Sequence, residues 1–344
     1  MIDWTRPYVA RWRVFRVDRD TWADGEAVGG VDSVSVRRDA TGAAPLVESG
    51  TLRATGPALA DDYHRVVMTA EQGGQYERVE VATLLLDATG GTRRRGADER
   101  ESVGHSVLWP AHATRMPEGA YVPRGADGAA YAARLLRSCC HAPVEVEGGF
   151  ALADDVTHEL GCRVLEAVWS VLRAGGHTIQ LAGDGTIRVL PLPTEPALTL
   201  DQAHAVLLDD GISRELDWSG VPNRYMAVEG RASAVAVNDD PASPTSTATR
   251  GFFVDEVDDS PIRVGGETLA AYARRRLAEL SVAEDERTYV RRWWPGVTTD
   301  SVVRGSIASA GLDGDMRVRS QSLECGRGIQ VTERAALEVR AWPT

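Results

Sequence analysis

Apolar and polar residues alternate in short runs near both ends of this 344-residue chain, and no other feature constrains its fold as strongly. Near the start, Ala10, Trp12 and Val14 alternate with arginines. A period of two is typical of a strand with one buried face, because successive side chains point to opposite sides. Turn dipeptides separate the runs: Asp24-Gly25, Gly29-Gly30, Thr41-Gly42 and Gly73-Gly74. The region from Tyr8 to Ala88 therefore predicts an antiparallel sandwich or barrel.

The middle of the chain changes to a helical period. Residues 124–139 and 162–173 place apolar side chains at helix spacing, and the second run stops at Gly175-Gly176. Beyond it, the Asp-Gly turn at Asp184-Gly185 predicts a hairpin between Thr178 and Leu190. We interpret this region as a separate α+β module.

Two further segments complete the organisation of the chain. The charged run from Gly90 to Glu101 is expected to connect the first β unit to the module. Strand patterns dominate again from Thr199 onward, interrupted by one expected helix from Gly266 to about Leu280. A length of 344 residues agrees with two or three domains, each able to bury a core.

Composition excludes several classes of protein. The chain contains no lysine, so all 38 basic residues are arginines. This removes the P-loop lysine, the Schiff-base lysine and the kinase strand lysine, and with them the chemistry that each supports. The net charge of -12 argues against a protein that grips nucleic-acid phosphates. The four cysteines are too few and too scattered for a disulfide framework, so reduced thiols are expected.

The chain shows no membrane or export signal. Its apolar runs stay short of the roughly 18 residues that a membrane span requires, and the start from Met1 to Arg6 has no signal-peptide core. We therefore expect synthesis in the cytoplasm, without export by a signal of its own.

Two short motifs suggest metal or thiol chemistry. His158-Glu159-Leu160-Gly161-Cys162 approaches the zincin pattern, but Cys162 stands where the second histidine would be, and a third ligand is lacking. A polar helix start with Cys162 packed inside is the simpler interpretation. Cys139-Cys140-His141 places a thiol beside a base, yet neighbouring side chains point apart, so buried small thiols are favoured.

Carboxylate pairs are abundant but occur in turn-like contexts. Glycosidases need two carboxylates across a cleft, and one sequence does not show such a spacing. Solvated loops are therefore favoured over a catalytic pair or a calcium loop. The six pairs are Asp61-Asp62, Asp154-Asp155, Asp209-Asp210, Asp239-Asp240, Asp258-Asp259 and Asp313 with Asp315.

Aromatic and basic clusters each allow two interpretations. Trp293-Trp294-Pro295-Gly296 could form a sugar platform or interface anchor, but its place after a strand and before a turn favours a barrel-closing cap. Arg274-Arg275-Arg276 could bind an anion or partner carboxylates, although a solvated or interface helix face is commoner.

The order of several motifs resembles the hub proteins of phage tails. In that family a Pro-Asn turn enters a strand, and an Asp-Pro-x-Ser-Pro loop precedes a helix and a final barrel. The likeness spans most of the chain. The segments that carry it are Gly161–Pro191, Val221-Pro222-Asn223-Arg224, Asn238–Pro244 and Gly266–Leu280.

The resemblance implies a mainly β fold with two tail-tube-like antiparallel β-barrels plus a mixed helix and hairpin domain. Residues 1–101 would form the first barrel, and residues 199–237 with 284–344 the second. Residues 102–198, joined by 238–283, would form the mixed module outside the ring.

The implied function is structural. Three copies would form a hub that joins the tail tube and distal tail proteins to tail-tip or fibre proteins, with DNA passing through the lumen without specific binding. The protein would reside in the virion tail after synthesis in the host cytoplasm. Neither catalytic residues nor cofactor-binding or metal-binding residues are expected, and no cofactor.

An acidic lumen would repel phosphate and let DNA slide, in agreement with the net charge of -12. Two other functions remain open at this point. One is a cell-wall glycan-binding tail-tip module that uses exposed tryptophans. The other is a carboxylate-dependent glycan hydrolase.

Overall fold

A computed structural model describes residues 2–40, 45–55, 62–94, 97–201, 207, 211–326 and 328–342. Strand accounts for 50% of the chain and helix for 15%, so the predicted mainly β class is confirmed. The helices of the described residues include none that is long and apolar enough to cross a membrane.

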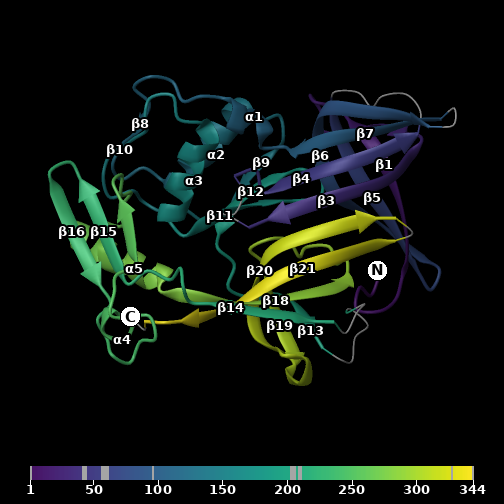
Figure 1. The fold of residues 1–344 in the computed structure, drawn as a ribbon. Coiled ribbons are helices and arrows are strands. Elements are labelled where there is room, and N and C mark those ends of the chain that lie inside the picture. The colour runs from purple at the N-terminus through teal and green to yellow at the C-terminus, as the bar shows by residue number, and fades with distance from the viewer. Residues whose placement is uncertain are drawn as a thin grey trace.

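Thirteen strands from both ends of the chain share one sheet (Figure 1). The strands of the first half are β1 (Val9–Val17), β2 (Asp24–Val28), β3 (Val31–Asp39), β4 (Glu48–Thr55), β5 (Tyr63–Gln72), β6 (Gln75–Arg94) and β7 (Ala97–Ser106). Those of the second half are β13 (Pro196–Leu200), β14 (Ser213–Asp217), β18 (Val282–Arg292), β19 (Val302–Ile307), β20 (Leu312–Cys325) and β21 (Ile329–Arg340). A 3-10 turn, Ala308–Ala310, separates β19 from β20.

The two halves are joined where β20 pairs with β3, with Val34 opposite Cys325 and Val36 opposite Leu323. The main path runs β14-β18-β21-β20-β3-β4-β7-β6-β5-β1-β2 and does not close into a ring within the described residues. Two separate closed barrels are therefore not confirmed. Alternation in a sequence specifies the buried face of a strand but leaves its partner strand open.

The charged run from Gly90 to Glu101 was predicted to be a connector, and this prediction was wrong. β6 continues to Arg94 and β7 begins at Ala97, and the two pair with Thr92 opposite Glu99. A run of charged residues does not by itself end a sheet, because the ladder bonds come from the backbone.

The helices and the hairpin predicted for the middle of the chain are present. They are α2 (Gly128–Cys139), α3 (Val164–Ala174), β11 (His177–Leu181) and β12 (Ile187–Pro191), accompanied by α1 (Trp109–Ala113), β8 (Tyr121–Val122), β9 (Val144–Val146) and β10 (Val156–Thr157). α2 begins four residues later than predicted because Asp127 caps it, with Oδ1 accepting from the Ala129 amide at 2.9 Å.

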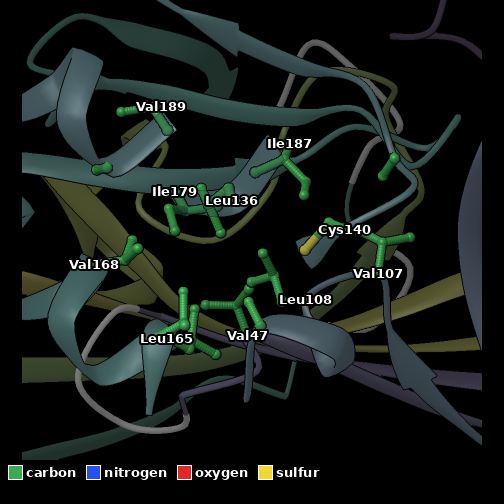
Figure 2. Close-up of a cluster of buried hydrophobic side chains, with 14 of the residues drawn as sticks. Val47, Val107, Leu108, Leu136, Cys140, Leu165, Val168, Ile179, Ile187 and Val189 are labelled. Atoms are coloured by element: carbon green, nitrogen blue, oxygen red, sulfur yellow. The ribbon is translucent and has the colours of Figure 1, made fainter. Parts of the chain in front are cut away.

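This module shares a core with the first sheet (Figure 2). Leu136 of α2 and Val168 of α3 face Ile179 of the hairpin, and Val107 and Leu108, directly after β7, lie in the same cluster. All five side chains are almost fully buried. The helices thus pack on the sheet through continuous apolar contact, while the three-unit division of the chain stays a prediction.

A small second body stands at one end of the molecule (Figure 1). Its sheet, in the order β16-β15-β17, packs on helix α5 through Tyr225, Ala227, Ala273 and Leu277. Its elements are β15 (Arg224–Glu229), β16 (Ala232–Val237), α4 (Thr247–Arg250), β17 (Asp255–Asp258) and α5 (Leu269–Leu280). Thr268 caps α5, because its hydroxyl accepts from the Ala271 amide at 3.2 Å.

Candidate functional site

One face of the sheet formed by β14, β18 and β21 gathers carboxylates. Glu215 lies directly opposite Glu286, Asp217 opposite Glu284, and Glu284 opposite Glu338. We call these five residues the carboxylate face. Like charges directly opposite each other destabilise a strand pair, so this arrangement needs compensation.

Three arginines compensate part of this charge. Arg334 donates to both oxygens of Glu286 at 2.8 and 2.7 Å, and Arg317 donates to Glu338 at 3.2 Å. Arg319 contacts both Glu284 and Glu338. Five carboxylates against three guanidinium groups leave the face acidic. β14, which forms the edge of the sheet, is exposed along its whole length.

On the opposite side of the same strands lies a buried polar network. Arg291 and Glu333 are both fully buried, and Nη2 of Arg291 donates to Oε2 of Glu333 at 2.5 Å. Tyr289 donates to the other carboxylate oxygen at 2.6 Å, and Gln321 donates to Oε2 at 2.7 Å. Burial lowers the pKa of Arg291, but the contact with Glu333 outweighs it and the pKa is raised. The network therefore links β18, β20 and β21 through one carboxylate.

The Pro-Asn strand entry is built around Asn223, which is fully buried. Its Nδ2 donates to the carbonyls of Thr245 and Phe252, each at 3.0 Å, and its Oδ1 accepts from the Val254 amide at 2.9 Å. One side chain thus holds the end of the Asn238–Pro244 loop and the start of β17.

The second asparagine of the chain completes this network. Asn238 is also fully buried, and its amide donates to the Asn223 carbonyl at 2.8 Å. Its side-chain Nδ2 donates to Oγ of Ser243 at 2.9 Å. The Asp-Pro-x-Ser-Pro loop is consequently held by the hydrogen bonds of buried polar side chains rather than by apolar packing.

Solved structures with a similar fold are phage and secretion tail proteins. The chain superposes on a tail protein from Neisseria meningitidis MC58 with a TM-score of 0.68 and 18% identity, over 96% of this chain and 97% of that one. This chain has the fold of a phage tail protein. The resemblance inferred from its motifs is thereby confirmed.

Two other structures share this tail-protein fold. The prophage MuSo2 43 kDa tail protein from Shewanella oneidensis matches with a TM-score of 0.61 and 12% identity, over 98% of this chain and 100% of that chain. The E. coli c3393 protein, a component of the type VI secretion system with structural similarity to T4 bacteriophage tail proteins gp27 and gp5, matches with a TM-score of 0.50 and 12% identity. That match covers 91% of this chain and 77% of that one. No family model and no curated protein matches the sequence.

In this tail-protein fold the zincin-like motif is structural. The Tyr131 hydroxyl lies 2.9 Å from Nε2 of His158, and the two rings are stacked. Burial lowers the pKa of His158, and burial raises that of Cys162, so both groups favour their neutral forms. The described residues contain no group of three or more side chains suited to hold a metal ion.

Cys140 and His141 have separate, structural surroundings instead of acting as a nucleophile and its base. Cys140 is buried beside α1, and burial raises its pKa to about 12. His141 lies against Tyr63, with ring centroids 6.1 Å apart. The structure thus places Cys140 in the module core of Figure 2, as the buried-thiol interpretation predicted.

The carboxylate pairs are engaged in local structure rather than facing each other across a cleft. Asp154 accepts from Arg263 at 2.7 Å, Asp155 from the Arg124 amide at 2.7 Å, and Asp258 from Tyr225 at 2.9 Å. Asp62 accepts from two arginines of the first hairpin. Asp61 and the Asp209-Asp210 pair lie outside the described residues.

The tryptophan pair is part of the protein interior. Trp293 is 4% exposed, its carbonyl accepts from Tyr8 at 2.7 Å, and its ring meets Trp4 edge-on at 6.1 Å. Trp294 is half-buried against the core of the second half. This burial agrees with a cap and leaves no sugar platform at Trp293.

The three arginines at 274–276 differ in their contacts. Arg275 pairs with Glu267 and Glu279, and Arg276 pairs with Glu279. Arg274 is exposed on the other flank of α5.

Sequence reasoning did not single out Arg291 and Glu333, although the alternation from Arg287 to Trp293 places Arg291 on the face of the buried Tyr289.

Proposed function

We propose that the chain is a non-enzymatic structural subunit of a tail, namely the hub that joins the tail tube to the tail tip. The observation that supports this proposal is the likeness to a tail protein over nearly the full length of both chains, at a TM-score of 0.68. A match over 97% of that chain leaves little of it without a counterpart here. What the two chains have in common is the fold over nearly their whole length, and the proposal extends this likeness to a structural role.

Three copies form the ring in this proposal. A three-chain ring that mates with a six-fold tube must present two similar faces per chain. Residues 1–101, and residues 199–237 with 284–344, supply those faces, and residues 102–198 with 238–283 lie outside the ring. The sheet that these two β regions share gives them a common support.

The carboxylate face lines the lumen in this proposal. Its surplus of negative charge repels phosphate, so DNA slides past without being held. The protein resides in the virion tail and contacts the tail tube, distal tail proteins and tail-tip or fibre proteins. A structure of the ring with arginines, instead of Glu215 and Asp217, toward the lumen would overturn this part.

Light scattering after size exclusion, over a wide range of concentration, tests the hub. A mass of three chains, with rings in negative stain, is the expected result. A strict monomer, both alone and when added to assembled tail tubes, contradicts it. As a control for solution behaviour, Arg134→Met should leave the mass unchanged, because Arg134 is exposed on α2, in the module that lies outside the ring.

A further inference from the structure

An apolar and acidic segment lies exposed at the edge of the small sheet. Phe252, Phe253 and Val257 are 59%, 52% and 56% exposed, which is unusual for such side chains in one short stretch. The sequence from Phe252 to Asp259 also carries four carboxylates. We call it the Phe252–Asp259 segment.

The segment is held rigidly. The Arg224 guanidinium lies 3.9 Å from the centroid of the Phe253 ring and donates to both oxygens of Asp255 at 2.6 Å. Asn223 binds the backbone at Phe252 and Val254. Little conformational entropy is therefore lost when a partner covers these side chains.

The face beside the segment is also apolar and uncovered. Met226 lies between Val235 and Val257 in the register of the three strands. Because Tyr225 and Ala227 point toward α5, Met226 and its neighbours in the register point to the opposite side of the sheet.

A complementary groove lies on the outer flank of α5. It has a volume of about 490 Å³, and Ala270, Ala271 and Ala278 form its apolar part. Arg274 and Arg340 stand at its sides and are both exposed. Within the described part of the chain neither of them makes an ion pair. Arg275 and Glu279, which pair with each other, complete the lining of the groove. We call this the alanine–arginine groove.

The two surfaces face different directions on one copy. Ala270, Arg274 and Ala278 form one stripe of α5, about a quarter turn from the stripe of Ala273 and Leu277 that packs on the sheet. The Phe252–Asp259 segment does not contribute to the lining of the groove, and its end lies beside Tyr272 and Arg276, on another flank of α5. A copy therefore does not fill its own groove, whereas a neighbouring copy presents the segment.

We propose that the Phe252–Asp259 segment of one copy docks in the alanine–arginine groove of a second copy. Phe252 and Phe253 enter the alanine-lined part. Glu256 and Asp259 meet Arg274 and Arg340, since Asp255 and Asp258 already accept hydrogen bonds within their own copy. Charge and apolarity are complementary between the two surfaces. The contact is head-to-tail, so three copies related by a closing rotation all make it, on the outside of the ring that the two β regions form. This inference rests on the proposed function and adds which surfaces meet.

Two variants, one for each surface, test the contact. The segment variant is Phe252→Ser with Val257→Ser, and the groove variant is Arg274→Glu with Arg340→Glu. Matched controls are Tyr121→Ser, an aromatic residue 60% exposed elsewhere, and Arg134→Glu on α2. Circular dichroism first shows that each variant is folded. We expect both test variants to shift the trimer midpoint to at least about tenfold higher concentration, and the controls to leave it unchanged.

Mixing the two variants sharpens the test. The groove of the segment variant is intact, and so is the segment of the groove variant. A head-to-tail contact therefore predicts that the mixture assembles at a lower concentration than either variant alone, because the intact segment of one variant docks in the intact groove of the other. A contact that pairs segment with segment, or groove with groove, would give no such rescue.

The outcomes separate this inference from the hub. A wild-type trimer with unaffected test variants overturns the inference and leaves the hub standing. A wild-type dimer that both variants abolish supports the contact and overturns the three-copy ring. A wild-type monomer at all concentrations overturns the contact and the ring together.

Discussion

Arg291 and Glu333 form an ion pair that solvent does not reach, with 2.5 Å between Nη2 and Oε2 and both side chains fully buried. Removing one partner of a buried pair leaves an uncompensated charge. We expect Arg291→Met to lower the free energy of unfolding by about 3 to 5 kcal/mol. Urea denaturation followed by fluorescence measures this loss.

Two comparisons complete this prediction. The double variant Arg291→Met with Glu333→Leu should be more stable than Arg291→Met alone, because no charge stays buried. Arg304→Met breaks an exposed pair, in which Arg304 donates to both oxygens of Asp315, and should cost at most about 1 kcal/mol. Equal losses for Arg291→Met and Arg304→Met would contradict the argument.

Asn223 is the point at which two carbonyls and one amide are satisfied by a single side chain. Asn223→Asp replaces the Nδ2 donor by an oxygen and buries a charge, so we expect a loss of about 2 to 4 kcal/mol. Hydrogen exchange should increase mainly between residues 238 and 258. Ser219→Ala, in an exposed turn nearby, serves as the control. Protection unchanged in Asn223→Asp would show that other bonds hold the loop.

The lowered pKa of Asp285 leads us to expect a loss of stability in acid. Hydrogen bonds from Arg287, and then from Arg214, lower its pKa to about 2 from an ordinary 3.8. A lowered carboxyl pKa contributes stability above the unfolded value, and this contribution disappears as the pH falls from about 4 through 2. After allowance for solvent screening, it amounts to about 1 to 2 kcal/mol.

Asp285→Asn should therefore flatten the decrease in unfolding free energy between pH 4 and pH 2. Thermal or urea unfolding at a series of pH values measures the slope. Asp315→Asn, whose carboxylate is solvent-exposed in its pair with Arg304, should change the slope much less. Parallel profiles for wild type and Asp285→Asn would refute the assignment.

The thiols should differ in reactivity. Burial raises the pKa of Cys140 and of Cys325 to about 12, so few thiolates form at either site at pH 8. Alkylation of the folded protein, followed by mass spectrometry of its peptides, should label Cys139 first. Cys140 and Cys325 should react only in urea. Rapid labelling of Cys140 in the folded state would show that its burial is not maintained.

Local elements were predictable where one residue type dictates the backbone. Asp184-Gly185 predicted the β11–β12 hairpin, and Gly185 indeed has a φ of +84°, which favours glycine. Gly175 likewise ends α3 near the predicted position. The Asp127 cap shifted the start of α2 because a cap depends on one side-chain bond that apolar periodicity does not reveal.

Long-range pairing was not predictable. The alternation along β18 assigns Asp285, Arg287, Tyr289 and Arg291 to one face, and all four are buried. A sequence pattern gives no reason to bury two arginines until the partners are known, and Glu333 approaches from another strand. The tail-protein fold, by contrast, was predictable from the order of weak motifs.

The pairing of β3 with β20 leaves an edge of β3 open during synthesis of the chain. β3 pairs with β4 on one side, but its other edge is covered by β20, which is translated much later, with Cys325 opposite Val34. At about 5 to 20 residues per second, roughly 15 to 60 seconds separate their emergence from the ribosome. During that interval the nascent first half carries an open strand edge, which is a template for joining other chains. Protection of this edge during synthesis would therefore decide the yield of assembled particles.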